Sequence, residues 1–87
     1  MNARKLIIDV REPEEYAGGH VQGAVNAPLS GLMKGEPLPS DTPKDAKLVL
    51  YCNSGNRSAV AAKILRQQGF TDVENGINRE EVKAKYS

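Results

Sequence analysis

The sequence contains only one cysteine, Cys52, and only one histidine, His20, among its 87 residues. A single cysteine excludes an internal disulfide and every zinc or iron–sulfur site built from several cysteines. With one histidine beside it, the chain offers no sensible set of metal ligands, so we expect no metal site. Cys52 is therefore either an inert core residue or a reactive group, and that alternative decides the function.

Long apolar runs and an excess of charge are also missing. No apolar run approaches the roughly 18–20 residues that a membrane span needs. The basic N-terminus precedes only three apolar residues, at positions 6–8, too few for a signal peptide. We therefore expect a cytoplasmic protein, or a periplasmic one if a signal peptide has been removed. The net charge of +1 gives no bias towards nucleic acid or membranes as partners.

The length of 87 residues predicts one domain, over residues 1–87, and we expect a monomer. An apolar run predicts a strand at residues 6–8, and three more strands are predicted at residues 24–26, 47–51 and 72–74. Helices are predicted from Pro13, over 29–33, over 58–68, and from an Asn78 cap through Tyr86. Asn75 and Gly76 are interpreted as a turn, and residues 34–43 as an irregular loop. Strands that alternate with helices predict a small α/β domain with a parallel sheet.

The chemistry is predicted where the strand at 47–51 meets the next helix, in a six-residue loop from Cys52 to Arg57. Its middle residues, Asn53, Ser54, Gly55 and Asn56, accept turn conformations, and such turns can direct several backbone N–H groups at one point. The N-terminus of a helix beginning at Ser58 would face the same point, and both features stabilise a thiolate. A free cysteine is usually an inert core thiol. The position of Cys52 at the carboxyl end of a buried parallel strand favours the reactive alternative, because ligand sites lie there in open α/β sheets.

Charge supports the same interpretation. No acidic residue occurs between Ala46 and Thr71, a stretch with four basic residues, whereas residues 9–15 carry four acids. Arg57 lies within the loop itself. We expect it either to bind an anionic substrate or to brace the loop.

Three motifs resemble those of rhodanese-type sulfurtransferases. Residues 52–58, Cys-Asn-Ser-Gly-Asn-Arg-Ser, match the loop Cys-x-x-Gly-x-Arg-Ser; residues 6–16 match the strand and acidic turn; residues 19–28 match a Gly-His-Ile-x-Gly-Ala-x-Asn-x-Pro signature. The resemblance implies a four- to five-stranded parallel sheet flanked by helices. It also implies that Cys52 is the catalytic residue, which accepts sulfane sulfur as a persulfide without a cofactor, and that the substrate-binding loop comprises Asn53, Ser54, Gly55, Asn56, Arg57 and Ser58.

The chain departs from the family pattern at two places. Only five residues precede residues 6–16, where many members have an extra strand and helix. Residues 75–78, Asn-Gly-Ile-Asn, stand where many members have Gly-Gly and an aromatic residue. These departures affect the size of the sheet and the rim of the site, not the loop.

The expected reaction moves sulfur from thiosulfate, or from a persulfide or polysulfide donor, to cyanide, a thiol or a sulfur-accepting protein. Two alternatives remain open: a sulfur carrier or non-catalytic binding module, and a phosphatase or arsenate reductase. Cysteine-dependent phosphatases have five residues between cysteine and arginine, but here there are four. In the front half, Asp9, Arg11, Glu15 and His20 suggest a second cluster, which the resemblance implies is mainly structural.

Overall fold

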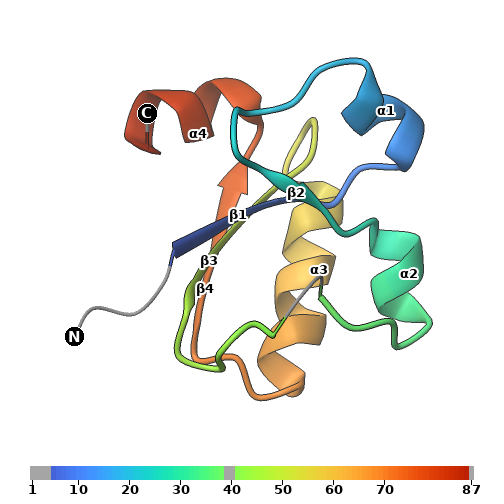
Figure 1. Ribbon diagram of the computed structural model, residues 1–87, viewed down its shortest axis with the longest axis vertical. Helices are drawn as coiled ribbons and strands as arrows, with labels where there is room; N and C mark the ends of the chain where they lie inside the picture. The colour runs from blue at the N-terminus through green and yellow to red at the C-terminus, as the bar shows by residue number, and fades with distance from the viewer. Residues whose placement is uncertain (1–4, 39–40, 87) are drawn as a thin grey trace.

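Four parallel strands form the centre of the protein in a computed structural model that describes residues 5–38 and 41–86. The strands are β1 (Lys5–Asp9), β2 (Val25–Asn26), β3 (Lys47–Tyr51) and β4 (Asp72–Ile77). Their order in the sheet is β2-β1-β3-β4, and β3 pairs with β1 over its full length (Figure 1). The predicted α/β class with a parallel sheet is confirmed.

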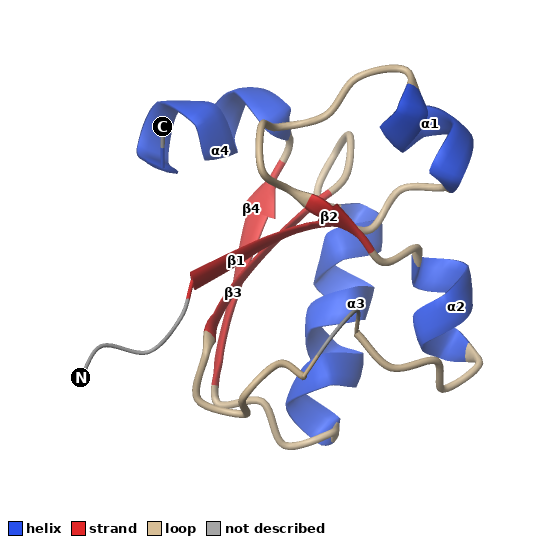
Figure 2. Ribbon diagram, in the orientation of Figure 1, coloured by secondary structure: helices blue, strands red, loops and turns tan. Residues whose placement is uncertain are grey.

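The helices are α1 (Pro13–Ala17), α2 (Leu29–Met33), α3 (Asn56–Gln67) and α4 (Arg79–Tyr86). Figure 2 shows α2 and α3 on one side of the sheet and α4 on the other. Side chains alternate along β3: Leu48 and Leu50 belong to the larger apolar cluster under α3, whereas Val49 and Tyr51 pack with Val82 of α4. The sheet is therefore covered on both faces, as a parallel sheet requires.

Helix α3 begins at Asn56, two residues before the predicted start at Ser58. Gly55 precedes it in the left-handed conformation, with a φ of 91°, and this sharp reversal allows the chain to enter the helix at once. The loop after β3 is therefore Cys52 to Gly55, and Arg57 lies in the first turn of the helix rather than in the loop.

Strand β4 extends to Ile77, so the predicted turn at Asn75 and Gly76 is wrong. Leu50 pairs with Asn75 and Tyr51 with Ile77, which leaves Gly76 as the extra residue of a bulge. A Cβ on Gly76 would lie 2.7 Å from Val82 Cγ2, so α4 packs against a strand that has no side chain there. Tertiary packing, not turn formation, requires this glycine.

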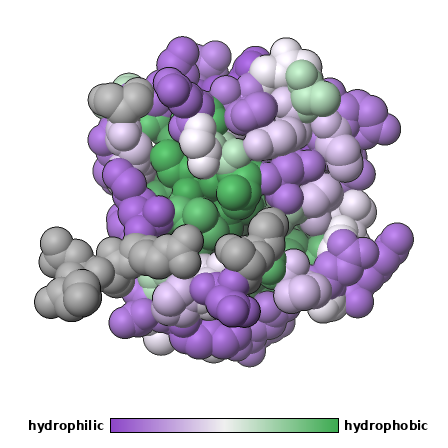
Figure 3. Space-filling model, viewed as in Figure 1, coloured by the Kyte–Doolittle hydropathy of each residue, from purple (hydrophilic) through white to green (hydrophobic). Residues whose placement is uncertain are grey.

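The face drawn in Figure 3 is mostly polar. Figure 3 shows one apolar patch near the centre of one face, surrounded by polar side chains. No helix in the described part of the chain is long and apolar enough to cross a membrane. Of the predicted loop at 34–43, Pro39 and Ser40 lie outside the described residues.

Candidate active site

Cys52 follows directly after β3, at the carboxyl end of the sheet, and only 1% of its surface is exposed. Its Sγ accepts a hydrogen bond from the Gly55 backbone N–H at 3.1 Å and lies 3.5 Å from Ser58 Oγ. Figure 1 shows this loop at the end of the molecule where α1 and the start of α4 also lie. The loop and the first turn of α3 therefore fold around a single sulfur atom.

The sulfur is surrounded by hydrogen-bond donors. Burial raises the pKa of the Cys52 thiol. The Ser58 side chain and the backbone N–H groups of Ser58, Ser54 and Gly55 outweigh burial and lower that pKa to about 7. Since the backbone donors are held by the helix start, they stabilise negative charge on the sulfur at little reorganisation cost.

Gly55 meets two demands at this position. Its φ of 91° is one that side chains rarely adopt, and a Cβ there would lie 3.3 Å from Cγ2 of Ile77. Ile77 is itself the only described non-glycine residue with a positive φ, 78°, and its carbonyl accepts the Cys52 N–H at 3.1 Å. The end of β4 thus fixes the loop through the Ile77 carbonyl and side chain.

Arg57 does not lie free beside the sulfur. Its two terminal nitrogens bind the two carboxylate oxygens of Glu15 in α1, at 2.7 and 3.0 Å. Asn53 Nδ2 also donates to Glu15, at 3.1 Å. The Arg57 hydrogen bonds lower the pKa of Glu15 to about 2, with further contributions from Glu12 and Asn53. Of the two roles expected for Arg57, binding an anionic substrate or bracing the loop, this geometry favours bracing.

Asn75 is a residue of the site that the sequence interpretation missed. Its side chain accepts a hydrogen bond from Ser58 Oγ at 2.6 Å and donates one to the Gly55 carbonyl at 3.1 Å. Its place at the carboxyl end of a parallel strand was the available signal. The Asn-Gly pair pointed to a turn instead. Ser54 of the loop and Asn56, the first residue of α3, are also predicted site residues, and both are exposed.

The front cluster is built differently. Asp9 and Arg11 form a buried ion pair at 2.6 Å, and Tyr51 Oη donates to Asp9 at 3.0 Å. His20 stacks on Tyr16, with ring centroids 3.7 Å apart, and its Nδ1 lies 2.9 Å from the Tyr16 carbonyl oxygen. These contacts join β1, β3 and the segment after α1, in agreement with the structural role expected of this motif.

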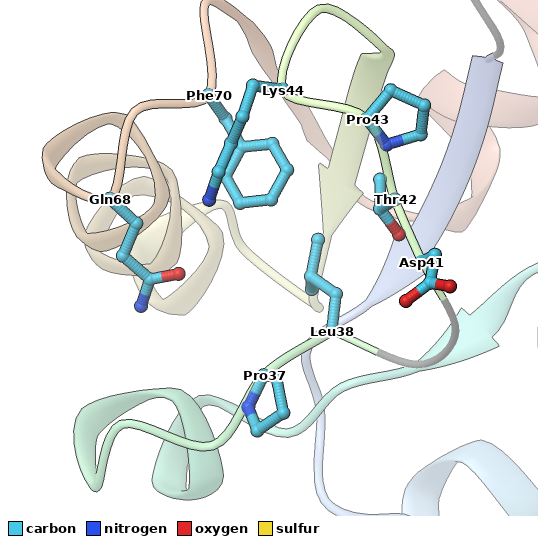
Figure 4. A pocket seen from close by; sticks show the side chains of 8 residues that line it. All are labelled: Pro37, Leu38, Asp41, Thr42, Pro43, Lys44, Gln68 and Phe70. Carbon is cyan, nitrogen blue, oxygen red and sulfur yellow. The ribbon is translucent and has the colours of Figure 1, made fainter.

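A hollow in the surface lies at the other end of the sheet. Its volume is about 460 Å³, and Pro37, Leu38, Lys44 and Phe70 are among its lining residues (Figure 4). Lys44 precedes β3 and Phe70 precedes β4, so this hollow lies at the amino ends of the strands, away from Cys52. The described residues contain no group of three or more side chains suited to hold a metal ion.

Comparison with known proteins gives consistent matches. The family model described as rhodanese-like domain matches residues 1–78. Thiosulfate sulfurtransferase PspE of Escherichia coli is 45% identical over 69 residues, which are 78% of this chain and 64% of PspE. Uncharacterized protein YqhL of Bacillus subtilis is 44% identical, over 79% of this chain and 52% of YqhL. The chain thus spans between half and two thirds of the length of these relatives. The three sequence motifs and the short single-domain form suggest a likeness to phage shock protein E (PspE), and the match to PspE confirms it.

Solved structures agree. A structure described as rhodanese with anions from E. coli is 37% identical, with a TM-score of 0.71, over 88% of this chain and 89% of that one. The human single-domain sulfurtransferase TSTD1 is 28% identical, with a TM-score of 0.73, over 97% of this chain and 85% of that one. On the family match, which covers most of the chain, and on the shared fold, this chain belongs to the rhodanese-like domain family.

Proposed function

We propose that the protein is a sulfurtransferase in which Cys52 carries sulfur as a persulfide from thiosulfate, or from a persulfide or polysulfide donor, to cyanide or a thiol. One observation carries the proposal: a buried thiol whose pKa is lowered to about 7 by the Ser58 side chain and by the backbone N–H groups of Ser58, Ser54 and Gly55. Relatives named thiosulfate sulfurtransferase support it. Another relative is named putative sulfur carrier protein YrkF, which supports the sulfur-carrier alternative; that alternative shares the first half of the proposed reaction.

In the first half-reaction, the Cys52 thiolate attacks the outer sulfur of thiosulfate. A bond forms between Sγ and that sulfur, the S–S bond of thiosulfate breaks, and sulfite leaves with the electron pair. Negative charge moves from Sγ to the outer sulfur. The backbone N–H groups that face Cys52 are donors suited to stabilise this charge. Because sulfite leaves as an anion, no general acid is needed.

In the second half-reaction, a nucleophile such as cyanide or a thiolate attacks the outer sulfur. The S–S bond of the persulfide breaks, and the Cys52 thiolate leaves with the electron pair. A lowered pKa makes Cys52 a better leaving group in this step as well as a more abundant thiolate in the first. The two steps together give ping-pong kinetics.

Arg57 enters this scheme as a brace of the loop. Its guanidinium is already bound by Glu15 through two hydrogen bonds, so an anionic donor has to compete with that carboxylate. Loop N–H groups and the start of α3 are then the main donors for the substrate anion.

The test is to treat the reduced protein with thiosulfate and measure its intact mass. We expect a gain of one sulfur atom, lost again with cyanide as thiocyanate forms. Cys52→Ser is the matched control and should gain nothing, since Cys52 is the only cysteine. A folded, reduced protein that takes no sulfur from thiosulfate or polysulfide would contradict the proposal.

The alternatives predict different results, the first in the same experiment and the second in a separate assay. A sulfur carrier would gain the sulfur but release it poorly to small thiols and cyanide. A phosphatase would hydrolyse para-nitrophenyl phosphate, for which the four-residue spacing between Cys52 and Arg57 predicts no appreciable rate.

A further inference from the structure

The Asn75 side chain connects the loop after Cys52, the first turn of α3 and the end of β4. Its Nδ2 donates to the Gly55 carbonyl at 3.1 Å. Its Oδ1 accepts two hydrogen bonds, from the Ile77 backbone N–H at 3.0 Å and from Ser58 Oγ at 2.6 Å. Every one of these contacts is within ordinary hydrogen-bonding distance.

These contacts fix the orientation of the amide. In the reverse orientation, its NH₂ group would face the Ile77 N–H and its oxygen would face the Gly55 carbonyl, and both contacts would be repulsive. The oxygen therefore faces Ser58. An amide oxygen cannot donate, so the Ser58 hydroxyl gives its one proton to Asn75.

This assignment determines what Cys52 receives from Ser58. With its proton directed at Asn75, the hydroxyl presents only lone pairs to the sulfur, 3.5 Å away. A thiol can donate to those lone pairs, but a thiolate cannot. Ser58 can contribute to stabilising the thiolate only when its proton turns from Asn75 to the sulfur. Ser58 is fully buried, so these two acceptors compete for the proton.

We propose that Asn75 is a positioning residue that competes with the Cys52 sulfur for the Ser58 hydroxyl proton. The proton points to Asn75 when Cys52 is a thiol or a persulfide, and to the sulfur when Cys52 is a thiolate. The consequence for sulfur transfer rests on the proposed function: Asn75 stabilises the persulfide form relative to the thiolate, because Sγ of a persulfide carries little charge. The chain then holds its sulfur more firmly than the same loop would without Asn75.

The charged groups around the loop do not provide a different explanation. They are Glu15 of α1 and Arg57 of α3, which pair with each other, Arg79 of α4, which donates to the Gly19 carbonyl, and the ion pair Asp9–Arg11. Glu74, next to Asn75 in β4, pairs with Lys47 and Lys85. Replacing Asn75 by alanine changes none of these charges. A shift of the thiol titration in that variant therefore reports on hydrogen bonds.

The experiment is a pH titration of the thiolate by its ultraviolet absorbance, with Cys52→Ser subtracted as the background from the tyrosines. This readout needs no access to the buried sulfur. Asn75→Ala should lower the midpoint by about 0.5–1 pH unit, the equivalent of one neutral hydrogen bond. Asn78→Ala is the matched control: Asn78 caps α4 through the Glu81 N–H, so the midpoint should not move.

A Ser58→Ala background shows whether Asn75 acts through the hydroxyl. Ser58→Ala alone should raise the midpoint, because the thiolate loses a donor, and adding Asn75→Ala should then have no further effect. A midpoint that rises or stays constant in Asn75→Ala overturns the proposal and leaves Asn75 as a brace. An equal fall in both backgrounds also overturns it.

A substitute variant and an independent measurement keep the outcome of the titration interpretable. Asn75→Gly, which also removes the amide, replaces Asn75→Ala if that variant does not fold. The thiolate titration is independent of sulfur uptake from thiosulfate, so failure of this proposal and failure of the proposed function are seen in different measurements.

Discussion

The ion pair between Glu15 and Arg57 yields the sharpest prediction about how the loop is held. Glu15→Gln removes the negative charge and keeps the shape of the side chain. It weakens the two hydrogen bonds from Arg57 and the one from Asn53. We expect the variant to fold, to be less stable than the wild type, and to leave the Arg57 guanidinium free.

The size of the effect follows from exposure. The pKa of Glu15 is lowered from 4.5 to about 2, chiefly by Arg57. The side chain of Arg57 is 35% exposed and that of Glu15 is 33% exposed, so solvent screens the pair. We therefore expect a loss of only about 1 kcal/mol at neutral pH. In a domain of this size, that corresponds to a fall in Tm of about 4–8 °C.

The dependence on pH has a definite sign. Because the pKa of Glu15 is lowered on folding, its ionised form stabilises the fold. That contribution is complete above pH 4.5 and is lost as the pH falls towards 2. The difference in Tm between wild type and Glu15→Gln should therefore be present at pH 7 and shrink in acid.

Thermal unfolding followed by circular dichroism over this pH range measures the difference. Glu14→Gln makes the same change of charge on an exposed neighbour in α1 and serves as the control. If Glu15→Gln is as stable as Glu14→Gln at pH 7, or if the difference persists in acid, the pair does not brace the loop. In Glu15→Gln the Arg57 guanidinium is no longer held by a carboxylate and can bind thiosulfate, so the KM for thiosulfate should fall. An unchanged KM would show that Arg57 does not bind the sulfur donor.

Two further predictions concern stability. Tyr51→Phe leaves Asp9 and the Val21 N–H without the Tyr51 hydroxyl. Urea unfolding should therefore show a free energy of unfolding lower by about 1–3 kcal/mol, with no change in the thiol titration. A decrease below about 0.5 kcal/mol would contradict the buried hydrogen-bond network. Ile77→Gly should leave the free energy of unfolding within about 1 kcal/mol of wild type, because relief of a left-handed backbone offsets the lost contacts. A loss above about 2 kcal/mol would show that the strain is small.

The strands and the loop could be predicted because their signals are local. Residues 48–51 form one apolar run, and the residues from Cys52 to Ser58 are consecutive, so the sequence itself contains the strand, the turn and the helix start. The apolar run, turn residues and helix pattern then place a cysteine at the carboxyl end of a parallel strand. The error of two residues at the start of α3 comes from Gly55, whose left-handed φ permits a tighter turn than expected.

The contacts around the loop could not be predicted, because they join distant parts of the chain. Glu15 and Arg57 are 42 residues apart, and Asn75 and Gly55 are 20 apart. Local preference assigned Asn75 and Gly76 to a turn. Pairing with β3 and the close approach of Val82 to Gly76 override that preference and extend the strand.

The two kinds of contact have different consequences for the thiol. The loop N–H groups depend on backbone geometry, which the Cys-x-x-Gly-x-Arg-Ser pattern itself favours. The positions that hold this geometry, Glu15 in α1 and Asn75 and Ile77 in β4, lie outside the pattern. Asn75 reaches the sulfur only through a hydroxyl proton that it can hold or release. Two chains with the same loop can therefore differ in thiolate stability and in how firmly they keep a bound sulfur, and that difference has to be sought in the neighbouring helix and strand.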